Sequence, residues 1–187
     1  MRMPLLFAAV LAGLVHAAGV AAADEPAPPR WIVTTNPVRM AILHVQVDVE
    51  RVVAPRVGVF LAPIGFYHAT WYPFAHAEHT TARGGGADFG ARYWFGRAPA
   101  GLFASPYFSL YRGMVYEHDV KTLDGWVASV GGQAGYQRLL GRWALSAGGG
   151  LSYGLASEEA PPGSAKAQQL PHRGVWLNFR LNAGVAF

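Results

Sequence analysis

The residues of this chain that offer the most chemistry are polar side chains at alternate positions of otherwise apolar segments. Gln46, Asp48 and Glu50 alternate with valines, and Arg92 stands among aromatic residues in the same way. The full set is Gln46, Asp48, Glu50, Asp88, Arg92, Gln133, Gln137, Asn178, Arg180 and Asn182. Such groups can pair with one another on a shared face, whereas they are costly against apolar surroundings. We therefore expect a buried polar network, with Asp48 or Glu50 close to Arg92 or Arg180.

Histidines and a glutamate in residues 68–79 are of the ligand types that zinc prefers. His76 and His79 lie three positions apart, with Glu78 between them and His68 upstream. This spacing is not diagnostic of a metal site, because histidines of polar segments are usually only solvated. We expect no metal and no cofactor.

The sequence lacks the common motifs of catalytic sites. It has no Gly-x-Ser-x-Gly elbow, no phosphate-binding loop and no dinucleotide-binding glycine fingerprint. A His-x-Ser pair, which an outer-membrane lipid A deacylase carries on a strand, is also missing, and His68-Ala69-Thr70 comes nearest to it. We expect no catalytic residue and no enzyme activity.

The polar residues must be positioned by strands, because the apolar residues around them recur with a period of two. The clearest case is residues 174–187, whose odd positions are all apolar and whose even positions are mostly polar or small. Asn178, Asn182 and Gly184 are short groups that suit a crowded, hydrogen-bonded interior better than a solvated face. This strand ends at the aromatic Phe187.

The same alternation predicts about eight strands in total. Their expected ranges are residues 31–35, 40–50, 57–67, 87–95, 102–116, 126–137, 143–155 and 174–187. The inward face of the third strand is left open because nearly every residue there is apolar, and that of the fifth is also left open. Pro106 is expected to produce a bulge. Inward glycines of the sixth and seventh strands are expected to leave room for Trp176 and Arg180.

The start of the chain predicts export from the cytoplasm. Arg2 precedes an apolar run, and Ala21-Ala22-Ala23 precedes Asp24, as in a secretory signal peptide that is cut after Ala23. We therefore divide the chain into a signal peptide (residues 1–23), a short lead-in (24–30) and a barrel (31–187). Cysteine is absent, so no disulfide stabilises the exported protein.

The composition favours a membrane β-barrel. Hydrophobic residues make up 52% of the chain and charged residues 14%, yet no run after the signal peptide is long enough for a spanning helix. In a membrane barrel the apolar residues are instead distributed over short alternating strands. The net charge of +4 comes from dispersed rather than clustered arginines, which argues against binding to nucleic acid.

We predict an all-β fold: a closed antiparallel up-and-down transmembrane β-barrel of about eight strands in the cell outer membrane. Short connections (54–56, 96–101 and 141) alternate with longer ones (68–86, 117–125 and 157–172), as in such barrels. Trp94 and Trp143 near the short turns, and Trp126 near the long loops, are expected in interfacial belts. A barrel of this size has an interior that side chains fill, so the polar set should form a plug.

The chain resembles the small uncharacterised outer-membrane β-barrels of the outer-membrane-protein β-barrel superfamily, a domain-of-unknown-function type. The resemblance lies in Thr35-Asn36-Pro37, in Val47-Asp48-Val49-Glu50 followed by Ala54-Pro55-Arg56-Val57, and in the terminal Phe187. It implies a barrel fold, a location in outer-membrane lipid, and a role of Phe187 as an assembly signal for the barrel-assembly machinery. It implies no reaction.

We expect a structural, adhesive or binding role carried by extracellular loops, with an unknown extracellular ligand. Three alternatives remain open: a lipid-modifying enzyme, a narrow pore, and a soluble periplasmic barrel that binds a small apolar ligand. An outward-facing catalytic pair would favour the enzyme, and a continuous water path past Arg92 and Arg180 would favour the pore. An apolar interior would favour the soluble barrel.

Overall fold

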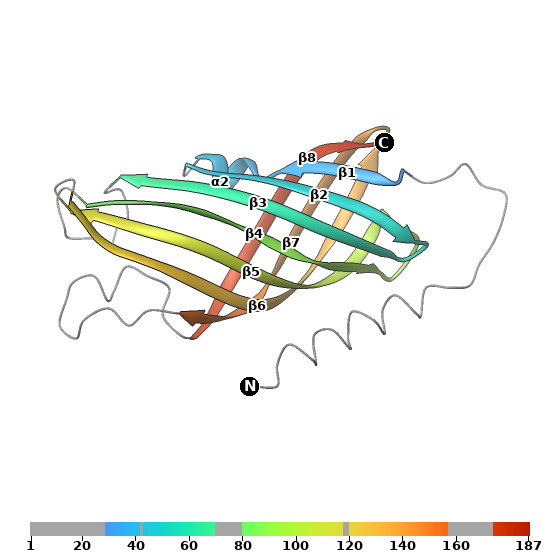
Figure 1. Cartoon of the computed structure of the whole chain (residues 1–187). Helices are drawn as coiled ribbons and strands as arrows, with labels where there is room; N and C mark the ends of the chain where they lie inside the picture. Colours follow the sequence, from blue (N-terminus) through green and yellow to red (C-terminus); the bar gives the residue numbers. More distant parts are fainter. Residues whose placement is uncertain (1–28, 42, 70–79, 118–119, 157–173) are drawn as a thin grey trace.

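The structure is a computed structural model that describes residues 29–41, 43–69, 80–117, 120–156 and 174–187. Within these residues eight strands form a closed barrel in the order β1-β2-β3-β4-β5-β6-β7-β8, each antiparallel to the next, with β1 pairing with β8 (Figure 1). The strands are β1 (Trp31–Thr35), β2 (His44–Ala54), β3 (Val57–Ala69), β4 (Thr80–Trp94), β5 (Gly101–Glu117), β6 (Val120–Leu140), β7 (Trp143–Ala156) and β8 (Gly174–Ala186). The predicted all-β, closed antiparallel fold is confirmed. The expected signal peptide lies outside the described residues.

The alternation of side chains sets the two faces of the wall, because successive residues of a strand point to opposite sides. On β3, Phe60, Ala62 and Ile64 are buried, so the even positions face inward. On β5, Phe103 and Tyr107 are buried, so there the odd positions face inward. The sequences of these two strands do not predict which of their faces points inward.

Two strands begin earlier than the sequence predicts. Residues 80–86 and 120–125, expected to be loop, belong to β4 and β6. The glycine run 84–86 reads as a loop in sequence, but here glycine makes room for aromatic rings. A Cβ on Gly84 would lie 2.2 Å from the carbonyl oxygen of Arg112 and 2.5 Å from Cζ of Phe66. One on Gly86 would lie 2.1 Å from the carbonyl oxygen of Leu110 and 2.6 Å from Cδ1 of Tyr111, so the close backbone of β5 also requires glycine.

A short helix, α2 (Pro37–Ala41), replaces the predicted start of the second strand, which begins at His44 instead of residue 40. The Oδ1 atom of Asn36 accepts a hydrogen bond from the amide of Arg39 at 3.0 Å. An asparagine before the helix and a proline at its first position are the preferred residues for a helix start. Asn36-Pro37 is therefore a helix start here and not a strand turn.

The predicted bulge at Pro106 is not found. Pro106 pairs with Gly132 on β6, and the register of β5 with β4 is the same on both sides of it. The register shifts instead between Val52 and Ala54 and between Val115 and Tyr116.

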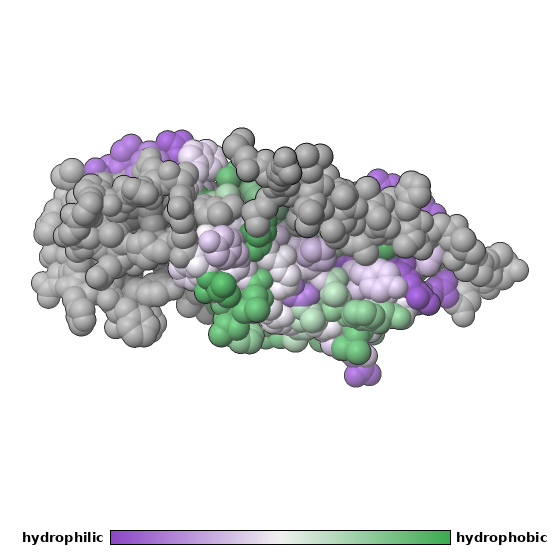
Figure 2. Space-filling model, turned by 90° about the horizontal axis from the view of Figure 1, so that it is seen from below, coloured by the Kyte–Doolittle hydropathy of each residue, from purple (hydrophilic) through white to green (hydrophobic). Residues whose placement is uncertain are grey.

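The outer surface is apolar over its middle. Leu177 is 76% exposed and Phe179 75%, and many outward residues of β3, β5 and β7 are also exposed. Figure 2 shows apolar residues on the visible outer face, with hydrophilic residues toward its ends. Within the described part of the chain, no helix is long and apolar enough to cross a membrane.

Candidate functional site

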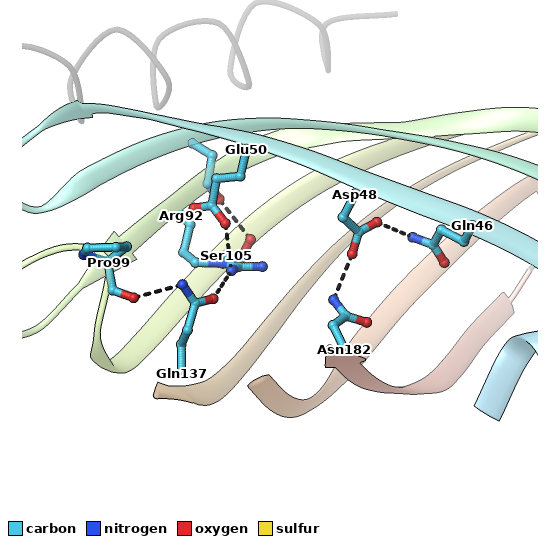
Figure 3. Close-up of polar contacts among 9 residues, drawn as sticks. Gln46, Asp48, Glu50, Arg92, Pro99, Ser105, Gln137 and Asn182 are labelled. Carbon is cyan, nitrogen blue, oxygen red and sulfur yellow. Dashed lines mark hydrogen bonds and ion pairs between the residues drawn. The ribbon is translucent and has the colours of Figure 1, made fainter. Parts of the chain in front are cut away.

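The interior of the barrel holds the predicted polar residues, and Arg92 of β4 is the centre of one cluster (Figure 3). Its Nη1 atom donates hydrogen bonds to Oε2 of Glu50 on β2 at 2.7 Å and to Oε1 of Gln137 on β6 at 2.6 Å. Gln137 in turn donates from Nε2 to the carbonyl of Pro99 in the β4–β5 turn at 2.7 Å. One arginine thus joins three strands and, through Gln137, a turn.

Aromatic rings surround the Arg92 guanidinium. Its carbon lies 4.3 Å from the ring centre of Phe103 and 5.9 Å from those of Phe60 and Trp94. Trp94 is 0% exposed, so its predicted place in an outward aromatic belt is wrong. Its even position in β4 is an inward one, shared with Arg92, and the ring packs with Ala98 and Phe103. Trp143 and Trp126, by contrast, are exposed on the outer face.

Inward glycines make the space for these rings. A Cβ on Gly58 would lie 2.6 Å from Oε1 of Glu50 and 2.9 Å from the Trp94 ring. A Cβ on Gly135 would lie 2.6 Å from Phe103. The sequence predicts that the glycines of β6 and β7 make room for Trp176 and Arg180, but those of β6 face rings of β5. The reason is register: Gly135 pairs directly with Phe103.

A second cluster is centred on Asp88 of β4. One carboxylate oxygen accepts a hydrogen bond from Arg180 Nη2 of β8, and the other accepts one from the hydroxyl of Tyr111 on β5. The Arg180 guanidinium also lies over the ring of Tyr107, 5.1 Å from its centre. Asn178 donates to the Tyr107 hydroxyl at 2.7 Å, so this cluster joins β4, β5 and β8.

A third cluster connects β2 with β8 and α2. Asp48 accepts hydrogen bonds from Gln46 Nε2 at 2.6 Å and from Asn182 Nδ2 at 2.7 Å (Figure 3). The Oε1 atom of Gln46 accepts a hydrogen bond from Arg39 Nη1 at 2.7 Å. Arg39 is therefore separated from Asp48 by an amide.

All ten residues of the predicted set lie in the interior, and nine of them take part in the three clusters. Gln133 is buried, and its amide has no hydrogen-bond partner among the described residues. Sequence reasoning missed Tyr107, Tyr111 and Arg39. The two tyrosines share the inward parity of Ser109, which was a usable signal, but Arg39 lies in a helix that strand periodicity does not reveal.

Outside the polar interior, an exposed ion pair lies on the β5–β6 hairpin. Arg112 donates two hydrogen bonds to Asp124, from Nε at 2.9 Å and from Nη2 at 3.0 Å, and Lys121 adds a third at 3.1 Å. The hydrogen bond from Arg112, with that from Lys121, lowers the pKa of Asp124 to about 2.

The final residue closes the barrel. Phe187 donates its amide to the carbonyl of Trp31 at 2.9 Å and accepts from the Trp31 amide at 2.8 Å. Its side chain is exposed on the outer face. This geometry places the expected assembly signal at the seam between β1 and β8.

The interior clusters tie distant strands together and contain no arrangement that holds a metal. Among the described residues, no group of three or more histidines, cysteines or carboxylates could bind one. The candidate ligands His76, Glu78 and His79 lie outside the part that the structure describes.

The comparisons with known proteins give a family. Its model is described as a protein of unknown function (DUF3575), and it matches residues 6–171. The chain belongs to the DUF3575 family. The match to DUF3575 stops before β8, the strand that carries Arg180 and the closing residues. No curated protein and no solved structure matches the chain.

Proposed function

We propose that this DUF3575 protein is an integral outer-membrane β-barrel with a plugged interior and a structural, adhesive or binding role. The observation that carries the proposal is the inverted polarity of the wall. Charged and amide side chains are buried inside, whereas leucine, phenylalanine and valine side chains are exposed outside. A soluble barrel that binds an apolar ligand needs the opposite arrangement, because burying apolar surface drives its folding.

The length of the strands supports the same location. A transmembrane strand needs about 9–11 residues. Strands β2 to β8 have between 11 and 21 residues, and only β1, with 5, is shorter. The outward face of β5 runs from Leu102 to Leu110 before it reaches Arg112, so its apolar part is about as tall as a hydrocarbon core. The longer strands therefore extend beyond the membrane on the side of the longer loops.

The plugged interior supports a binding or structural role over the narrow pore. Arg92, Glu50 and Gln137 meet across the lumen at 2.6–2.7 Å, and Phe103 and Trp94 pack beside them. The interior of an eight-stranded barrel is just wide enough for side chains to fill it, so these contacts favour a closed interior over a pore. The proposal includes no reaction, and it takes the barrel-assembly machinery as the partner that reads Phe187.

Cell fractionation tests the proposal. The mature protein should enter the outer-membrane fraction and migrate differently on gels before and after heating, because a closed barrel resists detergent until it is heated. Recovery in the soluble periplasmic fraction would contradict it.

A further inference from the structure

In the part of the chain that the structure describes, the wall of the barrel has a lateral opening beside β8. Strand β1 pairs with β8 only from Ile32–Ala186 to Thr35–Ala183, whereas β8 itself continues up to Gly174. Among the described residues, no strand pairs with this edge of β8 above Ala183. The helix α2 lies beside the gap, against β2 and β8 (Figure 1).

The residues Asn36 and Pro37 create this opening. Trp31 and Phe187 exchange both backbone hydrogen bonds, so the odd residues of the two strands face each other through their N–H and C=O groups. Thr35 stands opposite Ala183, so residue 37 would stand opposite Leu181 if the ladder continued. Pro37 has no N–H to donate there, and Asn36 starts a helix instead.

Within the described ranges, the backbone groups on this edge of β8 therefore have no partner strand and point into the opening. They belong to its odd residues Val175, Leu177, Phe179 and Leu181, whose side chains face outward. An open sheet edge is not tolerated against hydrocarbon, because each unsatisfied polar group costs several kcal/mol. This edge needs a polar partner.

A hollow of about 260 Å³ lies at the opening, and its lining combines cationic and apolar groups. Arg39 contributes a positive charge, and Arg180 contributes a guanidinium that is already paired with Asp88 through Nη2. Val38, Phe179 and Leu181 contribute apolar side chains that are exposed. Arg39 contacts the neutral Gln46 and no carboxylate among the described residues. Arg180 is 6% exposed, and its Nε atom has no hydrogen-bond partner among the described residues.

We infer that this opening binds a single-chain amphipathic anion, such as a fatty acid or an alkyl phosphate, and the inference rests on the proposed membrane location. The head group accepts hydrogen bonds from Arg39, from Nε of Arg180 and from the amides on the edge of β8 that pair with no described strand. Sites for drug-sized ligands measure roughly 300–1,000 Å³, so the hollow suits a head group and the first methylenes. The remaining methylenes of the ligand's alkyl chain lie along Phe179 and Leu177.

A second copy of the chain fits the opening less well. Antiparallel pairing of two β8 edges requires a two-fold axis perpendicular to the strands and to the wall. That axis lies in the membrane plane, so the two barrels would have opposite orientations in the membrane. Copies of one membrane protein have the same orientation, so this pairing is excluded. Charge complementarity instead favours an anion.

Binding to the folded barrel in uncharged maltoside micelles tests the inference, with heat-modifiable migration as proof of folding. Dodecyl phosphate is titrated into the protein while amide NMR signals are recorded. We expect saturable binding with shifts at Phe179 and Leu181, and no comparable binding of inorganic phosphate or dodecanol. Arg39→Gln should weaken binding about ten-fold or more, the loss expected for one charge-assisted hydrogen bond.

The matched control is Arg51→Gln, because Arg51 lies on β2 at the other end of the barrel, over the ring of Trp31. It should bind dodecyl phosphate as the parent protein does. Equal affinity in Arg39→Gln, equal binding of inorganic phosphate, or shifts spread over the whole apolar surface would overturn the inference while leaving the barrel proposal intact. A protein that does not fold in micelles contradicts the proposed function instead.

Discussion

Arg92 and Glu50 form an ion pair of 2.7 Å inside the barrel, although 42 positions of sequence separate them. The pair joins β2 to β4 across the interior, and both side chains are about 5% exposed or less. Replacing only one residue of such a buried pair is strongly destabilising, because the remaining charge stays buried without a partner.

Replacing one member of this pair should therefore destabilise the barrel strongly. Arg92→Met should lower the free energy of unfolding by about 3–5 kcal/mol, measured by urea unfolding of the refolded protein in micelles. The double variant Arg92→Met with Glu50→Leu should recover part of the loss, since no charge is then left alone. Losses that simply add in the double variant would show that the two residues do not interact.

The space left by Gly58 is a second testable feature. Gly58→Ala places a methyl group 2.6 Å from Glu50 and 2.9 Å from Trp94, and Trp94 is too tightly packed to move away easily. We expect a loss of about 1–3 kcal/mol in unfolding free energy. Gly132→Ala is the control, because nothing lies within 4 Å of a Cβ there. A similar effect of both variants would contradict the packing described for Trp94.

The helix start at Asn36 should be sensitive to loss of its side-chain acceptor. Asn36→Ala removes the hydrogen bond to the Arg39 amide and should cost about 1 kcal/mol in unfolding free energy, whereas Asn36→Ser keeps an acceptor and should cost less. Urea unfolding of the two variants measures the difference. Identical values for alanine and serine would mean that α2 does not depend on this cap.

The hairpin ion pair predicts a specific acid response. The pKa of Asp124 in the folded protein is about 2, below the value of about 3.9 for a free aspartate. The stabilisation from a lowered carboxyl pKa is complete above about pH 4 and is lost as the pH falls toward 2. Carboxyl ¹³C NMR should show Asp124 titrating near pH 2 and shifting toward 4 in Arg112→Gln. A midpoint near 4 in the parent protein would contradict the pairing.

The barrel and most of its interior follow from sequence because both depend on a period of two. The alternation within residues 46–50 and 178–182 shows directly which side chains point inward. In so small a barrel, a charged side chain that points inward needs an oppositely charged partner. The pairs themselves depend on register, which alternation does not fix, so Asp88 with Arg180 and Gly135 with Phe103 emerge only in the structure. The glycine run at Gly84 wrongly suggests a loop. A glycine that makes room for the Phe66 ring in a strand cannot be told apart in sequence from a glycine of a flexible loop.

The opening beside β8 shows a different limit. Asn36-Pro37 is compatible with a turn as well as with a helix start, and the local sequence does not choose between them. The pairing of β1 with β8 decides for the helix start. If that pairing continued, residue 37 would have to donate a backbone N–H, which proline lacks.

The central claim, that the outer face of this barrel lies in lipid, is tested most directly by an arginine scan along β5. Leu102, Ala104, Phe108 and Leu110 face outward on this strand, which lies away from the opening, and Arg112 marks the natural start of charge. Each is replaced in turn by arginine, with alanine at Leu102, Phe108 and Leu110 as the control, and the unfolding free energy is measured after refolding into lipid vesicles. We predict a penalty of about 2–4 kcal/mol for arginine near mid-strand that falls toward Leu102 and Leu110. A penalty without this depth profile, or complete folding without lipid or detergent, would contradict the account.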